Sequence, residues 1–402
     1  MYHCNVTFVI FCSYIIYNKL YITKMVFFDI LHEDTSSQAR IGVLRTEHGD
    51  VYTPIFMPVG TLGSVKAVEQ RNLSDDIKAE IILGNTYHLY LRPGCDVLTQ
   101  SHGLHNFINW HKPILTDSGG FQVYSLSKIR KINDEGVLFS SHIDGTKHFF
   151  TPEKIIDIQT IIGADIIMPL DECTPFNCGY NYTKESIART HMWLKRSLEH
   201  FIATRPHTKH QQHLFGIIQG SIYKELRKQS VDFITNVDVD GYSIGGVCHT
   251  QGKTEDLYNI AEYVCSLLPK NKPRYFMGVG TPKDILLCIG RGVDMFDCVH
   301  PTRCARHGRI YTTKGIMHMK NKKWENCFEP LDINIDNYIS QNYTKAYLHH
   351  LIRSQEILGC QLASIQNLAF YLWLIKEARE KIKNNIYKTW LDEILPIITT
   401  EL

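Results

Sequence analysis

Polar residues and glycines end most of the short apolar runs in this sequence, and several of the polar residues are carboxylates. The runs are EIILGNTYH, PILTDSGGF, DIIMPLDE, LFGIIQG, DGYSIGG, YFMGVGTP and MFDCVHPTR. The residues that end them include Asp117, Asp171, Gln219, Gly246, Gly278 to Gly280 and Asp297. Two carboxylates that face a sugar carbon can act as nucleophile and acid/base in a double displacement at the anomeric centre. Asp and Gln side chains also suit the edge of a purine-like base.

Any one of these aspartates could instead be a helix cap or a turn residue, which is the commoner role of Asp after a strand. Several carboxylates and an amide at equivalent positions indicate more than capping, provided that the fold brings them together. The residue types alone therefore favour either ribosyl transfer or glycoside hydrolysis.

Helix-like segments separate the apolar runs. In the segment from Thr151 to Ile162, Thr151 suits an N-cap, Pro152 the first helical position and Glu153 the first turn. Strands that alternate with helices predict a parallel sheet. Seven or eight such units over about 300 residues favour an α/β fold of the (β/α)₈ TIM-like barrel type, in which the ends of the strands meet at one rim. A doubly wound open sheet is the alternative, although no GxGxxG follows an early strand.

The two ends of the chain differ from this pattern. The string IGVLRTEHGDVYTPIFMPVG, from Ile41 to Gly60, predicts a hairpin that turns at His48, Gly49 and Asp50 and could close one end of the barrel. After Pro330 the sequence becomes strongly helical, with a wide apolar stripe. We therefore expect an N-terminal extension over 1–24 that is not part of the fold, a catalytic barrel over 25–330 and a helical subdomain over 331–402 packed on the barrel.

The composition fits a globular protein and excludes few functions. The chain has 402 residues, of which 44% are hydrophobic and 21% charged, and a formal net charge of only +2, so contacts with a nucleic acid would need local basic clusters. The twelve cysteines include no CxxC pair, which predicts reduced thiols and a cytoplasmic location. The apolar stretch from Val6 to Tyr17 is too short to span a bilayer, so we expect no membrane association.

Six strings in the same order resemble the successive motifs of bacterial tRNA-guanine transglycosylases. They are TDSGGFQVYSL (116–126), LDECTP (170–175), GIIQG (216–220), IGG (244–246), RYFMGVGTP (274–282) and MFDCVHPTRCAR (295–306), and the likeness extends over about Met25 to Ile375. The resemblance implies a pentosyltransferase of queuosine biosynthesis. Such an enzyme exchanges guanine at wobble position 34 of tRNAs with GU(N) anticodons for 7-aminomethyl-7-deazaguanine (preQ1), by double displacement.

The resemblance also implies roles for individual residues. Asp297 matches the family's nucleophile, and Asp117 matches the acid/base that handles the proton of the departing and incoming bases. Base binding would involve Asp117, Ser118, Gly119, Gly120, Phe121, Asp171, Gln219, Gly246 and Met277. In that set Asp171, Gln219 and the Gly246 amide would bind the polar edges of the base, and Phe121 and Met277 would hold its faces. Ordinary core packing is the alternative for Phe121 and Met277, and a plain tight turn for residues 118–120.

Two segments match the family's RNA-binding stretches. They comprise Gly278, Val279, Gly280, Thr281, Pro282, Lys283 and Asp284, followed by Thr302, Arg303, Cys304, Ala305 and Arg306. Arg303, Arg306 and Arg309 concentrate positive charge beside the expected nucleophile, although Arg309 could simply belong to a solvated loop. The partner would be a tRNA anticodon loop, whose target base must be splayed out to react.

The sequence departs from the family at two places. Most relatives bind a structural zinc through three cysteines and a histidine, but the aligned positions here are Ile335, Asn337, Ser340 and Gln366, so we predict no metal and no cofactor. Nearby Cys327, His349, His350 and Cys360 follow no zinc spacing. In relatives this region forms a homodimer interface, which makes a homodimer the expectation.

The second departure is VCHTQG at 247–252, where Gln251 replaces an expected carboxylate and His249 adds a bulky side chain. Cys173, beside Asp171, resembles the bacterial form and favours preQ1 over queuine as the incoming base.

Two other functions remain open. One is a non-catalytic tRNA-binding accessory subunit, which the presence of both Asp117 and Asp297 disfavours. The other is a barrel glycoside hydrolase, which would not explain the residues suited to a purine edge.

Overall fold

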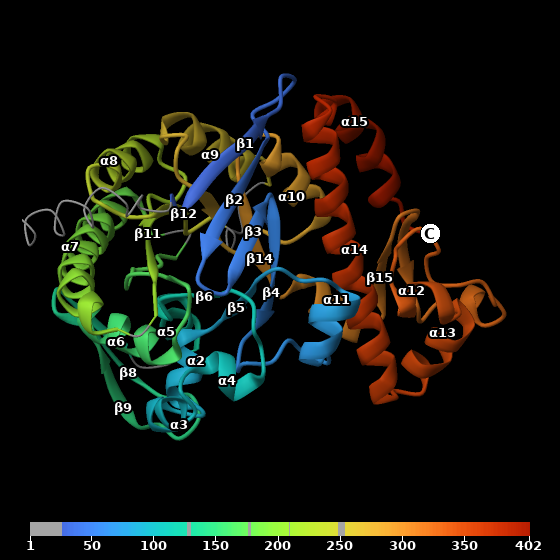
Figure 1. The fold of residues 1–402 in the computed structure, drawn as a ribbon, viewed down its shortest axis with the longest axis horizontal. Helices are drawn as coiled ribbons and strands as arrows, with labels where there is room; N and C mark the ends of the chain where they lie inside the picture. Colours follow the sequence, from blue (N-terminus) through green and yellow to red (C-terminus); the bar gives the residue numbers. More distant parts are fainter. Residues whose placement is uncertain (1–25, 127–129, 176–177, 209, 248–253) are drawn as a thin grey trace, which may run out of the picture.

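The computed structural model describes residues 26–402, apart from 127–129, 176–177, 209 and 248–253. Its centre is a closed barrel of eight parallel strands (Figure 1). In chain order these are β4 (Ile55–Gly60), β5 (Ile82–Gly84), β6 (Ile114–Thr116), β10 (Ile166–Ile167), β11 (His213–Ile218), β12 (Gly241–Ile244), β13 (Arg274–Phe276) and β14 (Met295–Cys298). The first strand pairs with the last, which closes the barrel. The (β/α)₈ prediction is confirmed, and the open doubly wound sheet is excluded.

Helices cover the outside of the barrel and connect its strands (Figure 1). They are α2 (Thr86–Leu91), α3 (Cys95–Gln100), α4 (Leu104–Ile108), α5 (Gly120–Leu126), α6 (Pro152–Ile162), α7 (Tyr180–Thr204), α8 (Lys224–Thr235), α9 (Thr254–Leu267), α10 (Pro282–Ile289) and α11 (His300–Arg306). The α6 helix begins as its sequence predicts, because the Thr151 side chain accepts a hydrogen bond from the Lys154 amide and Pro152 occupies the first turn. Short helical turns also occur at η1 (Asn72–Asp76) and η2 (Arg205–His207).

An antiparallel sheet of three strands is inserted between α5 and α6. Its strands are β7 (Arg130–Asn133), β8 (Gly136–Ser140) and β9 (Lys147–Phe150). This insertion packs beside the barrel through buried aromatic residues of β8 and β9, where the rings of Phe139 and Phe150 lie 4.7 Å apart.

A second antiparallel sheet closes the end of the barrel where the strands begin. It consists of β1 (Phe28–Glu33), β2 (Arg40–Thr46) and β3 (Gly49–Thr53). Phe28, Leu44 and Val51 of this sheet belong to the same buried cluster as the residues that point into the barrel, such as Met57 and Phe215. The predicted hairpin and its place at one end of the barrel are confirmed. Its turn is shorter than predicted, because Gly49 and Asp50 already belong to β3 and only Glu47 and His48 form the turn. However, the string VYTPIFMPVG is not one strand, because Pro54 separates β3 from the first barrel strand, β4.

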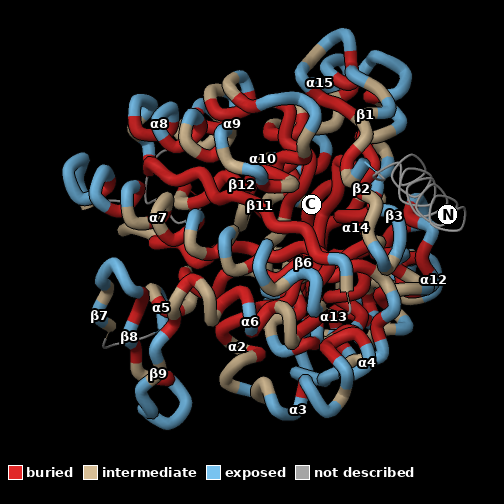
Figure 2. Tube along the Cα trace, turned by 60° about the vertical axis from the view of Figure 1, so that its left-hand side comes forward, coloured by how far each residue is buried: buried red, intermediate tan, exposed pale blue. Residues whose placement is uncertain are grey.

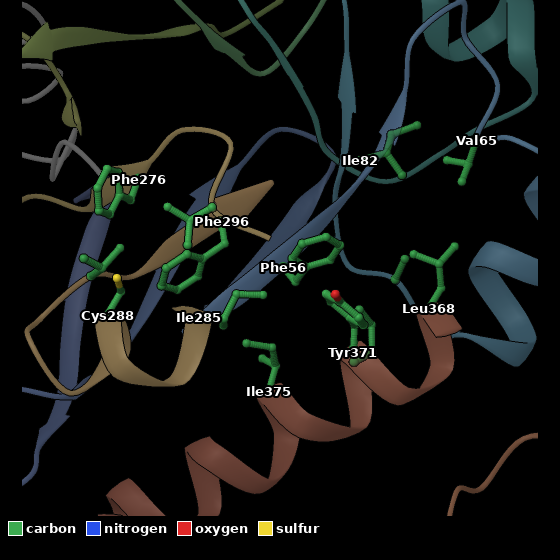
Figure 3. Packing of buried hydrophobic residues seen from close by; sticks show 14 of the residues in the cluster. Phe56, Val65, Ile82, Phe276, Ile285, Cys288, Phe296, Leu368, Tyr371 and Ile375 are labelled. Carbon is green, nitrogen blue, oxygen red and sulfur yellow. The ribbon is translucent and has the colours of Figure 1, made fainter. Parts of the chain in front are cut away.

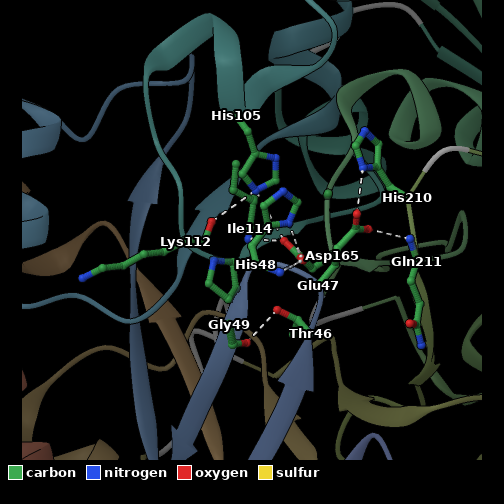
Figure 4. Close-up of polar contacts among 12 residues, drawn as sticks. Thr46, Glu47, His48, Gly49, His105, Lys112, Ile114, Asp165, His210 and Gln211 are labelled. Carbon is green, nitrogen blue, oxygen red and sulfur yellow. Dashed lines mark hydrogen bonds and ion pairs between the residues drawn. The ribbon is translucent and has the colours of Figure 1, made fainter. Parts of the chain in front are cut away.

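Ion pairs to two buried aspartates attach this sheet to the end of the barrel where the strands begin, which we call the floor of the barrel. Arg40 of β2 donates from Nε and Nη2 to the carboxylate of Asp294, which precedes β14, at 2.9 and 2.6 Å. Likewise, His48 in the β2–β3 turn lies 2.7 Å from Asp165, which precedes β10, and stacks on His105 (Figure 4). The hydrogen bond to Asp165 raises the pKa of His48. Burial opposes ionisation of Asp165, but hydrogen bonds from His105 and His48 hold its pKa well below the usual range.

The C-terminal elements extend the outer layer. They are β15 (Arg309–Thr312), β16 (Gly315–His318), η3 (Lys322–Trp324), α12 (Tyr338–Asn342), α13 (Lys345–Arg353), α14 (Ile357–Lys383) and α15 (Tyr387–Ile398). The long α14 helix lies against β4, with the rings of Tyr371 and Phe56 4.8 Å apart (Figure 3). Among the described residues α14 alone is long and apolar enough to span a bilayer, but 72% of its most apolar window is buried inside the protein (Figure 2). It therefore packs as a core helix.

Replacing Asp165 with Asn should lower the free energy of unfolding by about 3 kcal/mol, because it removes the carboxylate from a buried cluster and leaves the two histidines without their anion. Urea denaturation at pH 6 to 7 measures this change. The matched control is Asp157→Asn, which breaks the exposed pair with His200 and should cost less than about 1 kcal/mol. An equal effect of the two substitutions would contradict the role given to the floor cluster.

Candidate active site

A cavity opens at the rim where the barrel strands end. Its lining consists of Leu83, Asp117, Ser118, Gly119, Phe121, Gln122, Asp171, Cys173, Gln219, Gly245, Gly246, Tyr275, Met277, Gly278 and Asp297. Every residue that the sequence assigned to catalysis or base binding is in this lining except Gly120. That glycine lies behind it, where a Cβ would stand 2.6 Å from the carbonyl oxygen of Asp171. Thus the barrel brings together residues that are up to 180 positions apart (Asp117 and Asp297).

Asp117 follows β6 directly and is held by donors from the residues after β5 and from its own loop. The Asn85 side-chain amide donates to its Oδ2 at 2.5 Å, and the backbone amides of Thr86 and Gly119 donate to its Oδ1, both at 3.0 Å. Burial raises its pKa to about 7, and the nearby carboxylates of Asp297 and Asp171 act in the same direction. A carboxyl group with this pKa can both donate and accept a proton at neutral pH.

Asp297 is the last residue but one of β14 and is fixed through one oxygen. The Tyr275 hydroxyl and the Gly278 amide both donate to its Oδ1, at 2.5 and 2.7 Å. Burial raises the pKa of Asp297, while these two donors act against that rise because they stabilise the ionised form. When ionised, this carboxylate is an oriented nucleophile in the lining of the same cavity as Asp117.

Asp171 and Gln219 form a buried polar pair. The Ser118 hydroxyl donates to Asp171 Oδ1 at 2.7 Å, and the Gln219 side-chain amide donates to Oδ2 at 2.8 Å. Burial raises the pKa of Asp171. Gly246 lies against Gln219 with a φ of 71°, and a Cβ there would collide with the Gln219 Oε1. Phe121 and Met277 line the cavity beside this pair, which is the arrangement expected for a flat, polar-edged ligand.

The two segments matched to RNA binding flank the cavity, but most of their side chains are not available to a large ligand. Val279, Pro282, Thr302 and Ala305 are buried. Lys283, Arg303 and Arg306 are exposed cations on α10 and α11. The other members are Gly278, Gly280, Thr281, Asp284 and Cys304. Of these, Thr281 caps α10, and Asp284 accepts a hydrogen bond from Tyr258.

Arg309 differs from these three cations. It lies 2.8 Å from the carboxylate of Glu401 near the C-terminus. Its charge is therefore partly neutralised within the chain. The alternative that Arg309 belongs to a solvated loop is wrong, because Arg309 is the first residue of β15 and is half-buried.

Two polar partners of the carboxylates were not among the residues singled out in the sequence. Asn85 follows β5 in ILGNTYH, so the same rule of polar residues at strand ends could have found it. Tyr275 lies within β13, and nothing in its local sequence distinguishes it from a core tyrosine. His249 and Gln251, on which the choice of incoming base was expected to depend, lie outside the described residues.

Comparison with known proteins identifies the family. The family model described as queuine tRNA-ribosyltransferase matches residues 34–398. The chain belongs to the queuine tRNA-ribosyltransferase family. A queuine tRNA-ribosyltransferase of Halothermothrix orenii is 50% identical over 368 residues, which cover 92% of this chain and 96% of that protein. Proteins of the same name from Aquifex aeolicus and Oleidesulfovibrio alaskensis are 48% and 49% identical, over 91% and 90% of this chain and 97% and 95% of theirs.

The residues that take the place of the family's zinc ligands do not fit a zinc ion. Asn337 uses its side-chain oxygen to cap α12 and its amide to reach the carbonyl of Asp76. Gln366 donates to the Tyr311 carbonyl at 3.0 Å, and Ile335 and Ser340 are buried. None of these four offers a thiolate or an imidazole.

The described residues contain one other cluster of potential ligands, His48, His105 and Asp165 on the barrel floor. Its two imidazole rings are stacked 3.7 Å apart at an interplanar angle of 11°. Lone pairs that lie in two parallel planes cannot converge on one ion. The cluster is an ion pair with a stacked histidine, as the fold requires at that position.

The raised pKa of Asp117 predicts the pH dependence of base exchange. The rate at saturating substrate should fall above about pH 7, because Asp117 then loses the proton that a departing base needs, and should fall in acid as Asp297 becomes protonated. Asp117→Asn should lower the rate by about 10²- to 10⁴-fold. Initial rates of labelled-guanine incorporation measure both effects. A rate that stays flat through neutral and alkaline pH would remove Asp117 from this role.

Proposed function

We propose that this protein is a tRNA-guanine transglycosylase, a pentosyltransferase that replaces guanine at position 34 of GU(N)-anticodon tRNAs with preQ1. The observation that carries the proposal is that Asp117 and Asp297 line one cavity with Asp171 and Gln219. A nucleophile, an acid/base and a polar edge for the base thus lie around one binding site. Membership in a family of queuine tRNA-ribosyltransferases supports the same reaction class.

The reaction proceeds as two displacements at the ribose anomeric carbon. In the first, the Asp297 carboxylate bonds to that carbon as its bond to guanine breaks, and Asp117 gives a proton to the departing base. The product is a ribosyl ester of Asp297 and free guanine. In the second, the incoming base occupies the same site and gives a proton to Asp117 as its ring nitrogen bonds to the anomeric carbon. The ester bond breaks, and the Asp297 carboxylate is regenerated.

The cavity selects a purine-like base through its edges. Asp171 offers carboxylate oxygens, and Gln219 offers an amide and a carbonyl, to the donors and acceptors of a guanine ring. Phe121 and Met277 would contact the two faces of that ring. Cys173, which also lines the cavity, accompanies Asp171 and supports preQ1 as the incoming base in preference to queuine.

The tRNA would be bound by local charge, since the whole chain carries a net charge of only +2. Lys283, Arg303 and Arg306 are the exposed cations of the segments next to Asp297. Cations placed there can contact the phosphates on either side of the reacting nucleotide while its base is turned into the cavity.

A non-catalytic accessory subunit is the second candidate. It would need no oriented nucleophile. Burying a charge is unfavourable. Two buried carboxylates, with two donors arranged around Asp297 and three around Asp117, are therefore costly to keep unless the enzyme uses them. This cost favours the enzyme.

The proposal includes a cytoplasmic homodimer without zinc. Large apolar side chains of the C-terminal region are exposed in the single chain: Phe328 (74%), Ile333 (62%), Tyr338 (62%) and Ile357 (77%). Apolar exposure of this kind is typical of a surface that a partner covers. The residues at the zinc positions support a metal-free subdomain, in which Asn337 and Gln366 make side-chain hydrogen bonds and Ile335 and Ser340 are buried.

Replacing Asp297 with Asn should abolish both guanine exchange and the covalent RNA adduct, because an amide oxygen is too weak a nucleophile to form the ester. Labelled-guanine exchange measures the first, and a denaturing gel of enzyme incubated with tRNA measures the second. Asp157→Asn, a surface substitution on α6, serves as control and should leave both unchanged. A denaturation-resistant adduct in the Asp297→Asn enzyme would assign the nucleophile to another residue.

Native mass spectrometry of the purified chain tests the assembly and the metal together. We expect a mass of twice the 46.4 kDa chain with no stoichiometric zinc. A mass increment of one zinc per chain would overturn the metal-free proposal. A monomer at micromolar concentration would overturn the dimer, whatever the metal content.

A further inference from the structure

The strand that leads to Asp171 is too short to position it. β10 pairs with its neighbours only at Ile166 and Ile167, and the described pairing ends there. Asp171 lies four residues farther along the chain, in a segment without regular structure. Its carboxylate nevertheless meets Ser118 and Gln219 at 2.7 and 2.8 Å. Contacts outside the sheet must therefore hold the segment in place.

One of these contacts comes from α6, at the start of the segment. Gln159 is fully buried, and its side chain bonds to both backbone groups of Met168: the Met168 amide donates to Oε1 at 2.9 Å, and Nε2 donates to the Met168 carbonyl at 2.7 Å. These two bonds replace the backbone hydrogen bonds that β10 would make if it continued past Ile167. They fix the segment at Met168, three residues before Asp171, but not at its other end, after Asp171.

The far end is held through Glu172, which follows Asp171 and is buried. Its amide donates to the Thr190 hydroxyl oxygen at 3.2 Å, and its carbonyl accepts from Ser186 at 3.4 Å. Its carboxylate accepts a hydrogen bond from the Tyr182 hydroxyl at 2.5 Å and another from the Arg189 guanidinium. All four partners belong to α7, at positions 182, 186, 189 and 190, which share one face of a helix.

The same helix also fixes the insertion that follows α5. The Trp193 indole and Arg196 both donate to the carbonyl of Asp134 in the β7–β8 turn, at 2.8 and 2.9 Å. Arg189 lies 3.5 Å from the Asp134 carboxylate. Because β7 follows α5, which carries Phe121, α7 connects two walls of the cavity.

We propose that Glu172 is a positioning residue for the reaction, which places Asp171 against the base by anchoring the segment after β10 to Tyr182 and Arg189 of α7. The inference rests on the proposed function, since it assigns Asp171 to the edge of the bound base. Glu172 is not among the residues that line the cavity. Its effect on base binding would be exerted through Asp171, the preceding residue of the chain.

The chemistry of the anchor supports this role over simple packing. Stability alone does not explain the pair, because apolar residues of similar size in place of both Glu172 and Arg189 would stabilise the fold as well or better. The charged pair also fixes the orientation of the Glu172 carboxylate, because the Arg189 guanidinium binds one of its oxygens and the Tyr182 hydroxyl binds the other. Burial and the bond to Glu172 raise the pKa of Tyr182 to about 12, so its hydroxyl remains a donor at neutral pH.

The test is Glu172→Gln in the full-length chain, which keeps the size of the side chain and removes its charge. We expect the KM for guanine in the exchange reaction, and the Kd for guanine by calorimetry without tRNA, to rise about 10- to 100-fold. The KM for tRNA should change by less than about threefold, because phosphate contacts are made elsewhere. A purely structural role would lower kcat in proportion to the unfolded fraction and leave KM and Kd unchanged.

Three further variants test the positioning role of Glu172 even if Glu172→Gln folds poorly. Tyr182→Phe removes one hydrogen bond from the half-exposed side of the anchor and should raise the KM for guanine roughly threefold. Glu172→Gln combined with Arg189→Gln removes both charges of the pair and should recover stability without recovering guanine affinity. Glu153→Gln breaks the pair between α6 and Arg196 of α7 without touching Glu172 and should leave the KM for guanine unchanged.

The outcomes separate the two proposals. Guanine exchange by the unsubstituted protein, together with an unchanged KM and Kd for guanine in the Glu172 and Tyr182 variants, would overturn the positioning role and leave the proposed function standing. Absence of exchange and of guanine binding in the unsubstituted protein would overturn the proposed function itself. A rise in KM in Glu153→Gln equal to that in Glu172→Gln would assign the effect to general loosening of α7 and overturn the role of Glu172.

Discussion

The site depends on one electrostatic constraint: three carboxylates share a cavity in which they cannot all be ionised at low cost. Asp117, Asp171 and Asp297 all line it, and burial raises the pKa of each. Donors on each carboxylate act against this rise: a hydroxyl and an amide on Asp297, a hydroxyl and a carboxamide on Asp171, and three amides on Asp117. Asp117 nevertheless has a pKa of about 7, because burial and repulsion from the other two carboxylates outweigh its donors. A nucleophile and a proton carrier thereby coexist in one site.

The barrel makes this arrangement possible because its floor and rim have separate tasks. At the floor, the β1–β2–β3 sheet closes the barrel, and the pairs Arg40–Asp294 and His48–Asp165 hold it there. At the rim, short strands end in loops whose side chains are available for chemistry. Since the floor ties the beginnings of β10 and β14, neither Asp297 in β14 nor Asp171 in the segment after β10 also has to hold the fold together.

The outer helices do more than cover the sheet. Tyr371 of α14 packs on Phe56 and donates to the carbonyl of Gly280, so a helix near the end of the chain supports the loop next to Asp297. On the opposite side of the cavity, α7 binds Glu172 and the β7–β8 turn. Where a strand is as short as β10, such contacts replace the hydrogen bonds that a longer strand would provide.

The sequence by itself determined the alternation of strands and helices, the hairpin that closes the barrel, and the polar residues at the strand ends, because each of these is a local pattern. The cap of α6 at Thr151 and the glycine at 246 are equally local. Only the tertiary structure decided which partners surround those residues. Asn85 on Asp117, Tyr275 on Asp297 and α7 on Glu172 join segments that are far apart in the chain or look like ordinary core residues. The pKa of a carboxyl group depends on burial and on neighbouring charges, and both exist only once the barrel has closed.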